Sequence, residues 1–133
     1  MGPAIVQAPL CLGTRAPNFI ALHELFDKIN EDVEDSVDEI AERVVQVRSV
    51  AEGTARMAAK RSSLSEYPAT AVDGRSHVEA RSSALAAFGK SVRKAITDAN
   101  DLRDLDTADL FTEISCRMDK WLWFVEAHQQ AER

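Results

Sequence analysis

The sequence predicts an all-α protein, a helical bundle with three long helices and one short helix. Apolar residues recur at steps of three and four over three long stretches, and no stretch keeps the alternation that is typical of a strand. Only 5 glycines and 4 prolines occur among the 133 residues, which favours helices over turns. A hydrophobic share of 45% is enough for a core, and the length suits a single domain.

The first long helix should run from about Asn18 to about Arg48, a length that suits a bundle element. Its apolar stripe is expected to face the core and comprises Phe19, Leu22, Leu25, Phe26, Ile29, Val33, Val37, Ile40, Val44 and Val47. Gly53 then breaks the chain, and a short helix is expected from Thr54 to Ser62. Serines, Pro68 and Gly74 mark an irregular crossover after it.

The second long helix should run from about Arg75 to Asn100, with many alanines that allow neighbouring helices to approach closely. Its expected core residues are Val78, Leu85, Phe88, Val92, Ala95, Ile96 and Ala99. Asp106 or the nearby Asp104 should cap the third long helix, which ends near His128. The inward residues of that helix should be Leu110, Ile114, Met118, Trp121, Leu122 and Val125.

Four metal-ligand-type residues stand in a symmetric arrangement on the first helix. His23 and Asp27 are four apart, Asp38 and Glu42 are four apart, and both pairs share one midpoint. At about 100° per residue, all four fall within a stripe roughly 100° wide. Asp27 and Asp38 are nevertheless about 16 Å apart along the axis, at ~1.5 Å per residue, so one straight helix cannot bring both pairs to one ion.

A second copy of the helix, antiparallel about a two-fold axis at the midpoint, would set His23 opposite Glu42 and Asp27 opposite Asp38. This predicts two equivalent metal sites per dimer, each built from both chains. One imidazole with carboxylates suits iron or manganese better than a structural zinc ion. The competing interpretation is a solvated acidic face, which describes the neighbouring Glu31, Asp32, Glu34, Asp35 and Glu39 better than it describes the symmetric four.

Several motifs in one order resemble the Dps family, the ferritin-like mini-ferritins also described as DNA-binding proteins from starved cells. They are PNFIALHELFD (17–27), DEIAERV (38–44), SEYP (65–68), VRKAI (92–96), DTADL (106–110) and DKWLWFVEA (119–127). The resemblance implies a ferritin-like bundle within a spherical dodecamer, and a ferroxidase centre shared between subunits. Residue by residue, the ligand roles of that centre fall on His23, Asp27, Asp38 and Glu42, with ferrous and ferric iron as the metal and hydrogen peroxide as the oxidant.

The amino end departs from the family pattern. The family's first signature begins with a further histidine, an aromatic residue and a glycine, and these positions hold Cys11, Leu12 and Ala16 here. We therefore expect residues 1–16 to be an irregular segment and 17–133 to be the ferritin-like domain, with the family's first helix missing. Cys11 could bind iron as a thiolate, or it could belong to an unrelated segment. Without the first helix, residues 1–15 or oligomer contacts would have to cover an apolar groove.

Charge and cysteine usage limit the partners and the compartment. A net charge of −6, with no lysine near the amino end, makes DNA binding doubtful, because phosphate contacts need Lys and Arg. Cys11 and Cys116 form neither a disulfide framework nor a zinc motif, and they fit a reducing cytosol. The apolar run before Leu12 is a poor signal peptide, and no segment is long enough to span a bilayer. We expect a cytoplasmic protein.

The predicted function is iron storage and detoxification, with ferrous iron oxidised by peroxide and the cell protected from oxidative stress. The alternative is a non-enzymatic structural or interaction protein, a degenerate Dps-like bundle that has lost ferroxidase activity. His77 and His128 lie near helix ends, where an exposed or capping role is expected. One of Trp121 and Trp123 should pack in the core and the other at a subunit contact. Asp104, Asp106 and Asp109 should cap a helix or attract iron at a three-fold pore.

Overall fold

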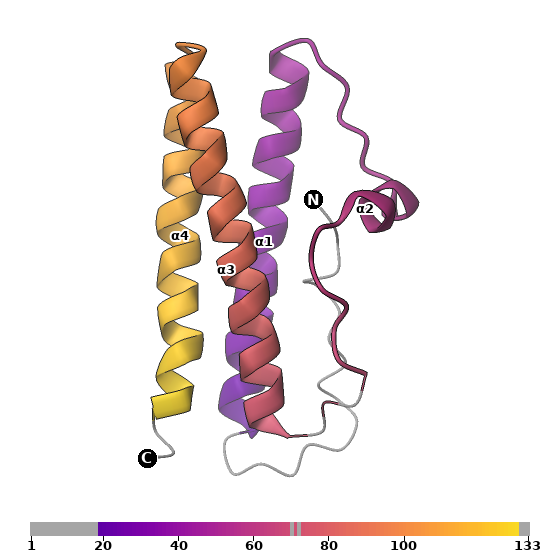
Figure 1. The fold of residues 1–133 in the computed structure, drawn as a ribbon, viewed down its shortest axis with the longest axis vertical. Coiled ribbons are helices and arrows are strands. Elements are labelled where there is room, and N and C mark those ends of the chain that lie inside the picture. The colour runs from indigo at the N-terminus through magenta and orange to yellow at the C-terminus, as the bar shows by residue number, and fades with distance from the viewer. Residues whose placement is uncertain (1–18, 70, 72, 131–133) are drawn as a thin grey trace.

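The computed structural model describes residues 19–69, 71 and 73–130, and over these residues it consists of four helices and their connections. The helices are α1 (Phe19–Gln46), α2 (Ala55–Arg61), α3 (Gly74–Asp101) and α4 (Leu105–Gln130). The three long helices lie side by side, with α1 and α3 running in one direction and α4 in the other (Figure 1). The predicted all-α architecture and its helix boundaries are confirmed to within two residues.

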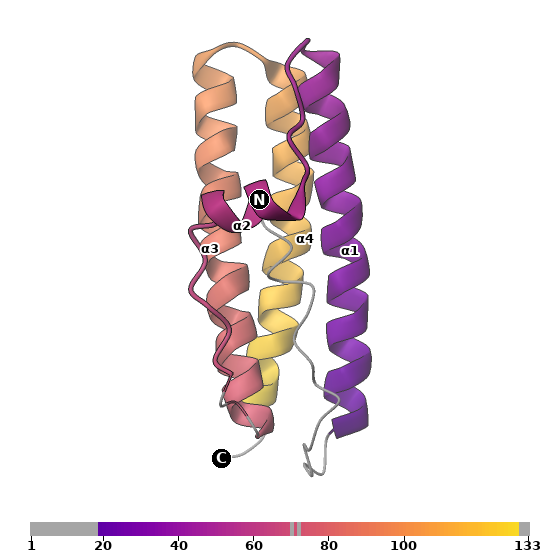
Figure 2. The same cartoon turned by 90° about the vertical axis from the view of Figure 1, so that its right-hand side faces the viewer.

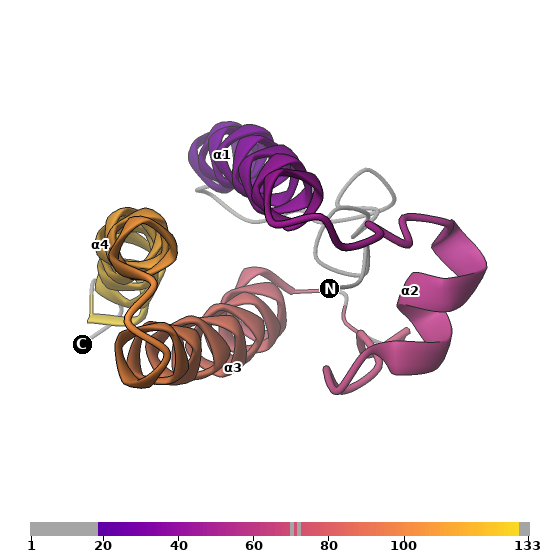
Figure 3. The same ribbon diagram turned by 90° about the horizontal axis from the view of Figure 1, so that it is seen from above.

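The short helix α2 lies apart from the three long helices. It stands about halfway along the bundle, on the long crossover that returns the chain from the end of α1 to the start of α3 (Figure 2). None of its residues is buried. The view along the bundle shows α1, α3 and α4 grouped together, with α2 beyond them (Figure 3).

Three of the helices begin where a short polar side chain replaces the missing backbone acceptor of the first turn. The Thr54 hydroxyl accepts from the backbone N–H of Met57 at 3.3 Å, before α2. Asp73 accepts from the backbone N–H of Ser76 at 2.8 Å, before α3. Of the two aspartates considered for α4, Asp104 caps the helix and accepts from the backbone N–H of Thr107 at 3.1 Å.

The core lies where the apolar stripes of the three long helices meet. Most of the expected inward residues are buried, and the buried cluster comprises Leu22, Phe26, Ile29, Val33, Ile40, Val78, Leu85, Phe88, Val92, Ile114, Met118, Trp121 and Val125. Two expectations are wrong, because Val37 is 39% exposed and Val47 is 50% exposed. Val37 lies at the edge of the α1 stripe. Val47 lies beyond the end of α1, where Arg48 adopts a φ of 63°.

Helix α4 holds α1 in place through charged side chains at two levels. Arg117 of α4 pairs with Asp32 at 3.2 Å and also with Glu39 of α1. Nearer the end of α1, Arg43 pairs with Asp104 at 2.8 Å, at the start of α4. These contacts are partly buried, so they are screened less than surface ion pairs and fix the rotation of α1 against α4. No helix among the described residues is long and apolar enough to cross a membrane.

Candidate metal centre

His23 and Asp27 lie on successive turns of α1 and approach each other. The Nε2 atom of His23 is 3.6 Å from Oδ2 of Asp27, and both side chains are partly exposed. The ring of Phe19 stacks on His23 with centroids 5.8 Å apart and planes 5° apart, which restricts how the imidazole can turn. The pair therefore offers one nitrogen and one carboxylate to an ion outside the bundle.

Asp38 and Glu42 lie further along the same helix, and both are exposed. Because α1 is one helix from Phe19 to Gln46, the two pairs are separated by the axial distance expected from the sequence. Within the described part of the chain, no three histidine, cysteine, aspartate or glutamate side chains are close enough together to hold a metal ion. One chain thus carries two incomplete ligand pairs, and the proposed ligand set stays a prediction.

The acidic residues of α1 divide into two faces with different surroundings. Asp32 and Glu39 point towards α4, where Arg117 pairs with both and the Trp121 Nε1–H donates to Asp32. The stripe that carries His23 and Glu42 lies roughly 150° around the helix from the buried residues, at about 100° per residue. The inner acids are consequently neutralised by α4, whereas the outer stripe faces solvent.

A buried arginine, which was not predicted from the sequence, lies behind the His23–Asp27 pair. Arg81 of α3 is 2% exposed, its Cζ lies 5.1 Å from the centre of the Phe26 ring, and its Nη1 donates to Oδ1 of Asn30 at 3.1 Å. Burial lowers the pKa of Arg81, and negative charge on Tyr67, when its phenol is ionised, and on Asp27 acts in the opposite direction. A positive charge therefore lies between the crossover and the ligand-bearing turn of α1.

His77 is not exposed, so the expectation of an exposed or capping role is wrong. It is 2% exposed, and its Nδ1 forms a hydrogen bond with the hydroxyl of Tyr67. A signal was present in the sequence, because His77 and Arg81 continue the stripe of Leu85 towards the start of α3. His128 is partly buried, and its Nδ1 lies 2.8 Å from the carbonyl oxygen of Phe124.

The remaining candidates have structural surroundings. Hydrogen bonds from Thr107, together with Arg43, hold the pKa of Asp104 below its ordinary value, as expected for a helix cap. Trp121 is buried as expected, and Trp123 is exposed, so its subunit contact stays a prediction. Cys116 is an exposed free thiol on α4. The residues at the expected positions of the further signature, Cys11, Leu12 and Ala16, lie outside the described residues.

Comparison with known proteins gives a consistent result. The family model of the ferritin-like domain matches residues 14–133. The DNA protection during starvation protein of Agrobacterium fabrum is 38% identical over 127 residues, which cover 96% of this chain and 78% of the relative. The protein of the same name from Mycolicibacterium smegmatis is 30% identical over 115 residues, which cover 86% of this chain and 62% of that relative.

Solved structures agree with the sequence comparison. A C-terminal deletion mutant of Mycobacterium smegmatis Dps superposes with a TM-score of 0.80 at 30% identity, covering 87% of this chain and 80% of that one. Dps from Staphylococcus aureus superposes with a TM-score of 0.82 at 26% identity, covering 90% of this chain and 79% of that one.

Proposed function

Because this chain belongs to the Dps family of ferritin-like proteins, we propose that it binds ferrous iron, oxidises it and stores the ferric product. The observation that carries the proposal is the pair of incomplete ligand sets on the outer face of α1. His23 is partly exposed, and Asp27, Asp38 and Glu42 are exposed. The four residues lie on one stripe, and the two pairs share one midpoint. A solvated acidic face would not require this symmetry.

The site is completed by a second copy of the chain. With two α1 helices antiparallel about a two-fold axis at the midpoint, His23 and Asp27 of one chain face Glu42 and Asp38 of the other. A two-fold interface repeats every contact, so the dimer holds two equivalent sites. Each site would contain one imidazole and at least three carboxylates, a ligand set suited to iron.

Two exposed apolar residues support this pairing. Ile20 and Val45 are among the exposed large hydrophobic residues of α1, and they share the midpoint of the two ligand pairs. Both fall within the ligand stripe at about 100° per residue. In the antiparallel dimer, Ile20 therefore lies opposite the partner's Val45 at each end, and an apolar contact encloses each metal site.

The reaction follows from the ligand charges. Carboxylates stabilise the ferric ion more than the ferrous ion, since their attraction to the metal grows with its charge. Two ferrous ions each give one electron to peroxide, which takes up two protons and leaves as water. Removing electrons in pairs avoids the release of hydroxyl radical. The ferric product would then mineralise in the cavity of the oligomer, which we propose to be the dodecamer of the family.

Protection of the cell would come from this iron chemistry. The relatives are named for DNA protection. The net charge of −6 does not favour binding to a polyanion, so we do not extend DNA binding to this chain. Consumption of ferrous iron and peroxide would protect DNA without contact.

The first experiment measures the absorbance of ferric product after ferrous iron and peroxide are added to the protein. Asp38→Ala should abolish the catalysed rise. Asp35→Ala is the matched control, since Asp35 is an exposed aspartate of the same helix outside the stripe, and it should leave the rise unchanged. Equal rates in wild type and Asp38→Ala would refute the proposal and favour a bundle without ferroxidase activity.

A mixing experiment tests whether each site uses two chains. One variant carries His23→Ala with Asp27→Ala, and the other carries Asp38→Ala with Glu42→Ala. Each variant alone should be inactive. In a mixed dimer one site receives both altered pairs and the other receives none, so random mixing should restore about a quarter of the wild-type activity. No recovery in demonstrably mixed dimers would contradict the shared site.

A further inference from the structure

The contact between Tyr67 and His77 joins two groups whose chemistry is complementary. Tyr67 is the single tyrosine of the chain and lies half-buried on the crossover, and His77 is buried on α3. The phenol oxygen and Nδ1 of His77 form a hydrogen bond, and the two rings stack with centroids 5.8 Å apart. A neutral imidazole can accept the phenol proton when the phenol loses an electron, because loss of an electron makes that proton strongly acidic.

This pair is connected to the ligand-bearing turn of α1. Arg81 lies one turn beyond His77 on α3, and its guanidinium is in contact with Phe26 and Asn30 of α1. Its charge acts on the phenol of Tyr67 on one side and on the carboxylate of Asp27 on the other. Arg81 therefore lies between the Tyr67–His77 pair, on which its charge acts, and Phe26, the residue before Asp27.

We propose that Tyr67 is an auxiliary one-electron donor to the iron site and that His77 receives its proton. The proposal rests on the ferroxidase function proposed above. In the step, one ferrous ion and one phenol each give one electron to hydrogen peroxide. The O–O bond breaks and two waters form with two protons taken from solvent, while the phenol proton moves to His77 and stays there. The products are one ferric ion and a neutral tyrosyl radical. A later ferrous ion reduces the radical, and the proton returns to the phenol.

An auxiliary donor would supply the second electron that peroxide reduction needs when only one ferrous ion is bound at the site. Reduction of peroxide to water takes two electrons, and a single ferrous ion supplies one. With His23 as its one histidine, each proposed site should hold the second ferrous ion weakly. An electron from Tyr67 would complete the reduction when one ion is bound, and would prevent release of hydroxyl radical.

The surroundings of His77 suit a reversible proton acceptor. Burial lowers the pKa of His77, Asp73 raises it and Arg81 lowers it further, so the resting imidazole is neutral and its acceptor nitrogen is available. An imidazolium formed there would be disfavoured by burial and by the charge of Arg81. The proton is therefore driven back when the radical is reduced, and Tyr67 can act again.

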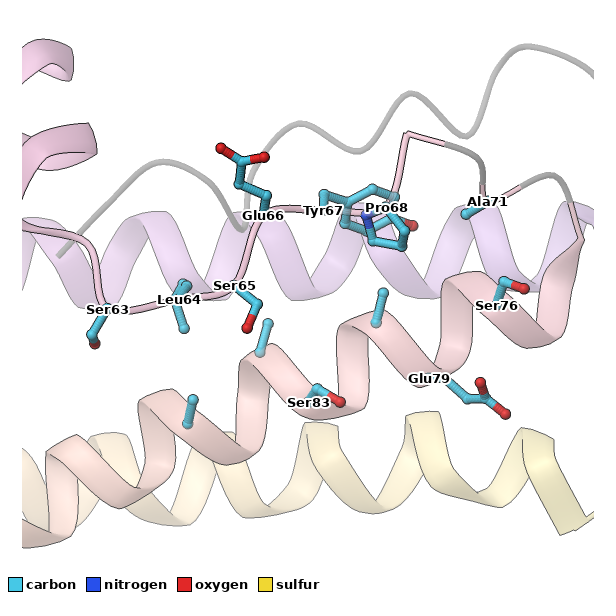
Figure 4. Close-up of a pocket in the computed structure, with 13 residues that line it drawn as sticks. Ser63, Leu64, Ser65, Glu66, Tyr67, Pro68, Ala71, Ser76, Glu79 and Ser83 are labelled. Atoms are coloured by element: carbon cyan, nitrogen blue, oxygen red, sulfur yellow. The ribbon is translucent and has the colours of Figure 1, made fainter.

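Tyr67 can also be reached from solvent. It lines a pocket of about 470 Å³ between the crossover and α3, together with Ser76, Glu79 and Ser83 (Figure 4). The pocket therefore gives the side chain of Tyr67 contact with solvent, separate from its hydrogen bond to the buried His77.

The test is freeze-quench electron paramagnetic resonance after one ferrous ion and one peroxide per chain are added to the 133-residue protein. Wild type should give a tyrosyl signal, which must come from Tyr67 because no other tyrosine exists. Tyr67→Phe removes the hydroxyl and keeps the ring, and it should lose the signal and release more hydroxyl radical to a spin trap. Trp123→Phe is the control for an exposed aromatic residue and should keep the signal. Ferric product without a tyrosyl signal in wild type would overturn the inference and leave the ferroxidase function standing.

A second measurement separates the pair from the iron chemistry. Flash oxidation of the metal-free protein by a photosensitiser should give the tyrosyl radical at a rate independent of buffer base, since His77 accepts the proton. His77→Gln should make that rate depend on buffer base. If this variant does not fold, the wild-type buffer dependence alone decides. A buffer-dependent rate in wild type would refute proton transfer to His77, whatever the result with iron.

Discussion

The proposed pairing of α1 with a second copy predicts that Ile20 and Val45 bury each other across the two-fold axis. The side chains are 65% and 60% exposed in one chain. Full burial of such a side chain is worth roughly 1.5–3 kcal/mol of free energy. Covering its exposed part in the dimer therefore stabilises association by roughly 1–2 kcal/mol. A substitution by glutamine occurs twice in the dimer. Each of Ile20→Gln and Val45→Gln should therefore weaken the free energy of dimer association by roughly 2–4 kcal/mol.

At 1.4 kcal/mol for each factor of ten, this cost corresponds to a rise in the dimer dissociation constant of about 30- to 700-fold. Sedimentation over a concentration series measures it. Leu105→Gln, on α4, is the control for loss of an exposed apolar side chain and should change the constant little. The double variant should cost less than the sum of the single variants, because the two residues share one contact. An unchanged constant in both single variants, or strict additivity, would refute the antiparallel pairing.

Three further predictions concern the metal, the axis and the cap. His23→Ala should abolish the tight binding of the one ferrous ion expected per site, whereas Cys11→Ser should change ferrous binding little. A titration that shows two tightly bound ferrous ions per site, or loss of binding in Cys11→Ser, would contradict this prediction. In the proposed dimer Glu31 would face the partner's Glu34 at the axis, and these like charges would repel each other. Mn²⁺ bound at the sites should therefore lower the dimer dissociation constant, and Glu31→Gln should lower it when a chelator removes the metal. Equal sedimentation with and without metal would count against this prediction. Asp104→Asn should lower the melting temperature at neutral pH and flatten its fall below about pH 4. The reason is that the depressed pKa of Asp104 stabilises the fold above its unfolded pKa, and this stabilisation is lost as pH falls through the folded pKa. Melting curves that stay parallel to wild type across this pH range would rule it out.

The helices could be predicted from the sequence because burial of one face imposes a period on the residues of that face. The length of the apolar stripe predicted the length of α1, and Asp104 was one of two aspartates that predicted the start of α4, where it accepts a local hydrogen bond. The period gives the direction of a side chain but not how far a neighbouring helix covers it. Val37 and Val47 were therefore placed in the core wrongly, one at the edge of the stripe and one past the helix end.

The buried polar groups could not be predicted in the same way. A charged or polar residue is buried only where partners satisfy it, and those partners come from other elements. Arg81 is buried because Phe26 and Asn30 of α1 receive its guanidinium, and His77 is buried because Tyr67 of the crossover meets it. Asn30 is 51 residues from Arg81, and Tyr67 lies on an irregular crossover whose path the sequence does not specify. The position of His77 near a helix end therefore indicated exposure, and nothing near Arg81 in the sequence drew attention to it.

The ligand stripe on α1 could be recognised for a different reason. Both halves of the proposed site lie on one helix, so their spacing is fixed by local geometry that the sequence records directly. The face on which they lie is fixed by long-range contacts, because Arg117 of α4 binds Asp32 and Glu39 and turns those acids inward. The outer acids are left with no comparable cation from α4, and bringing two such faces together is unfavourable without positive charge. In a dimer of this kind the positive charge is supplied by the metal, so the substrate would also stabilise the interface that forms its site.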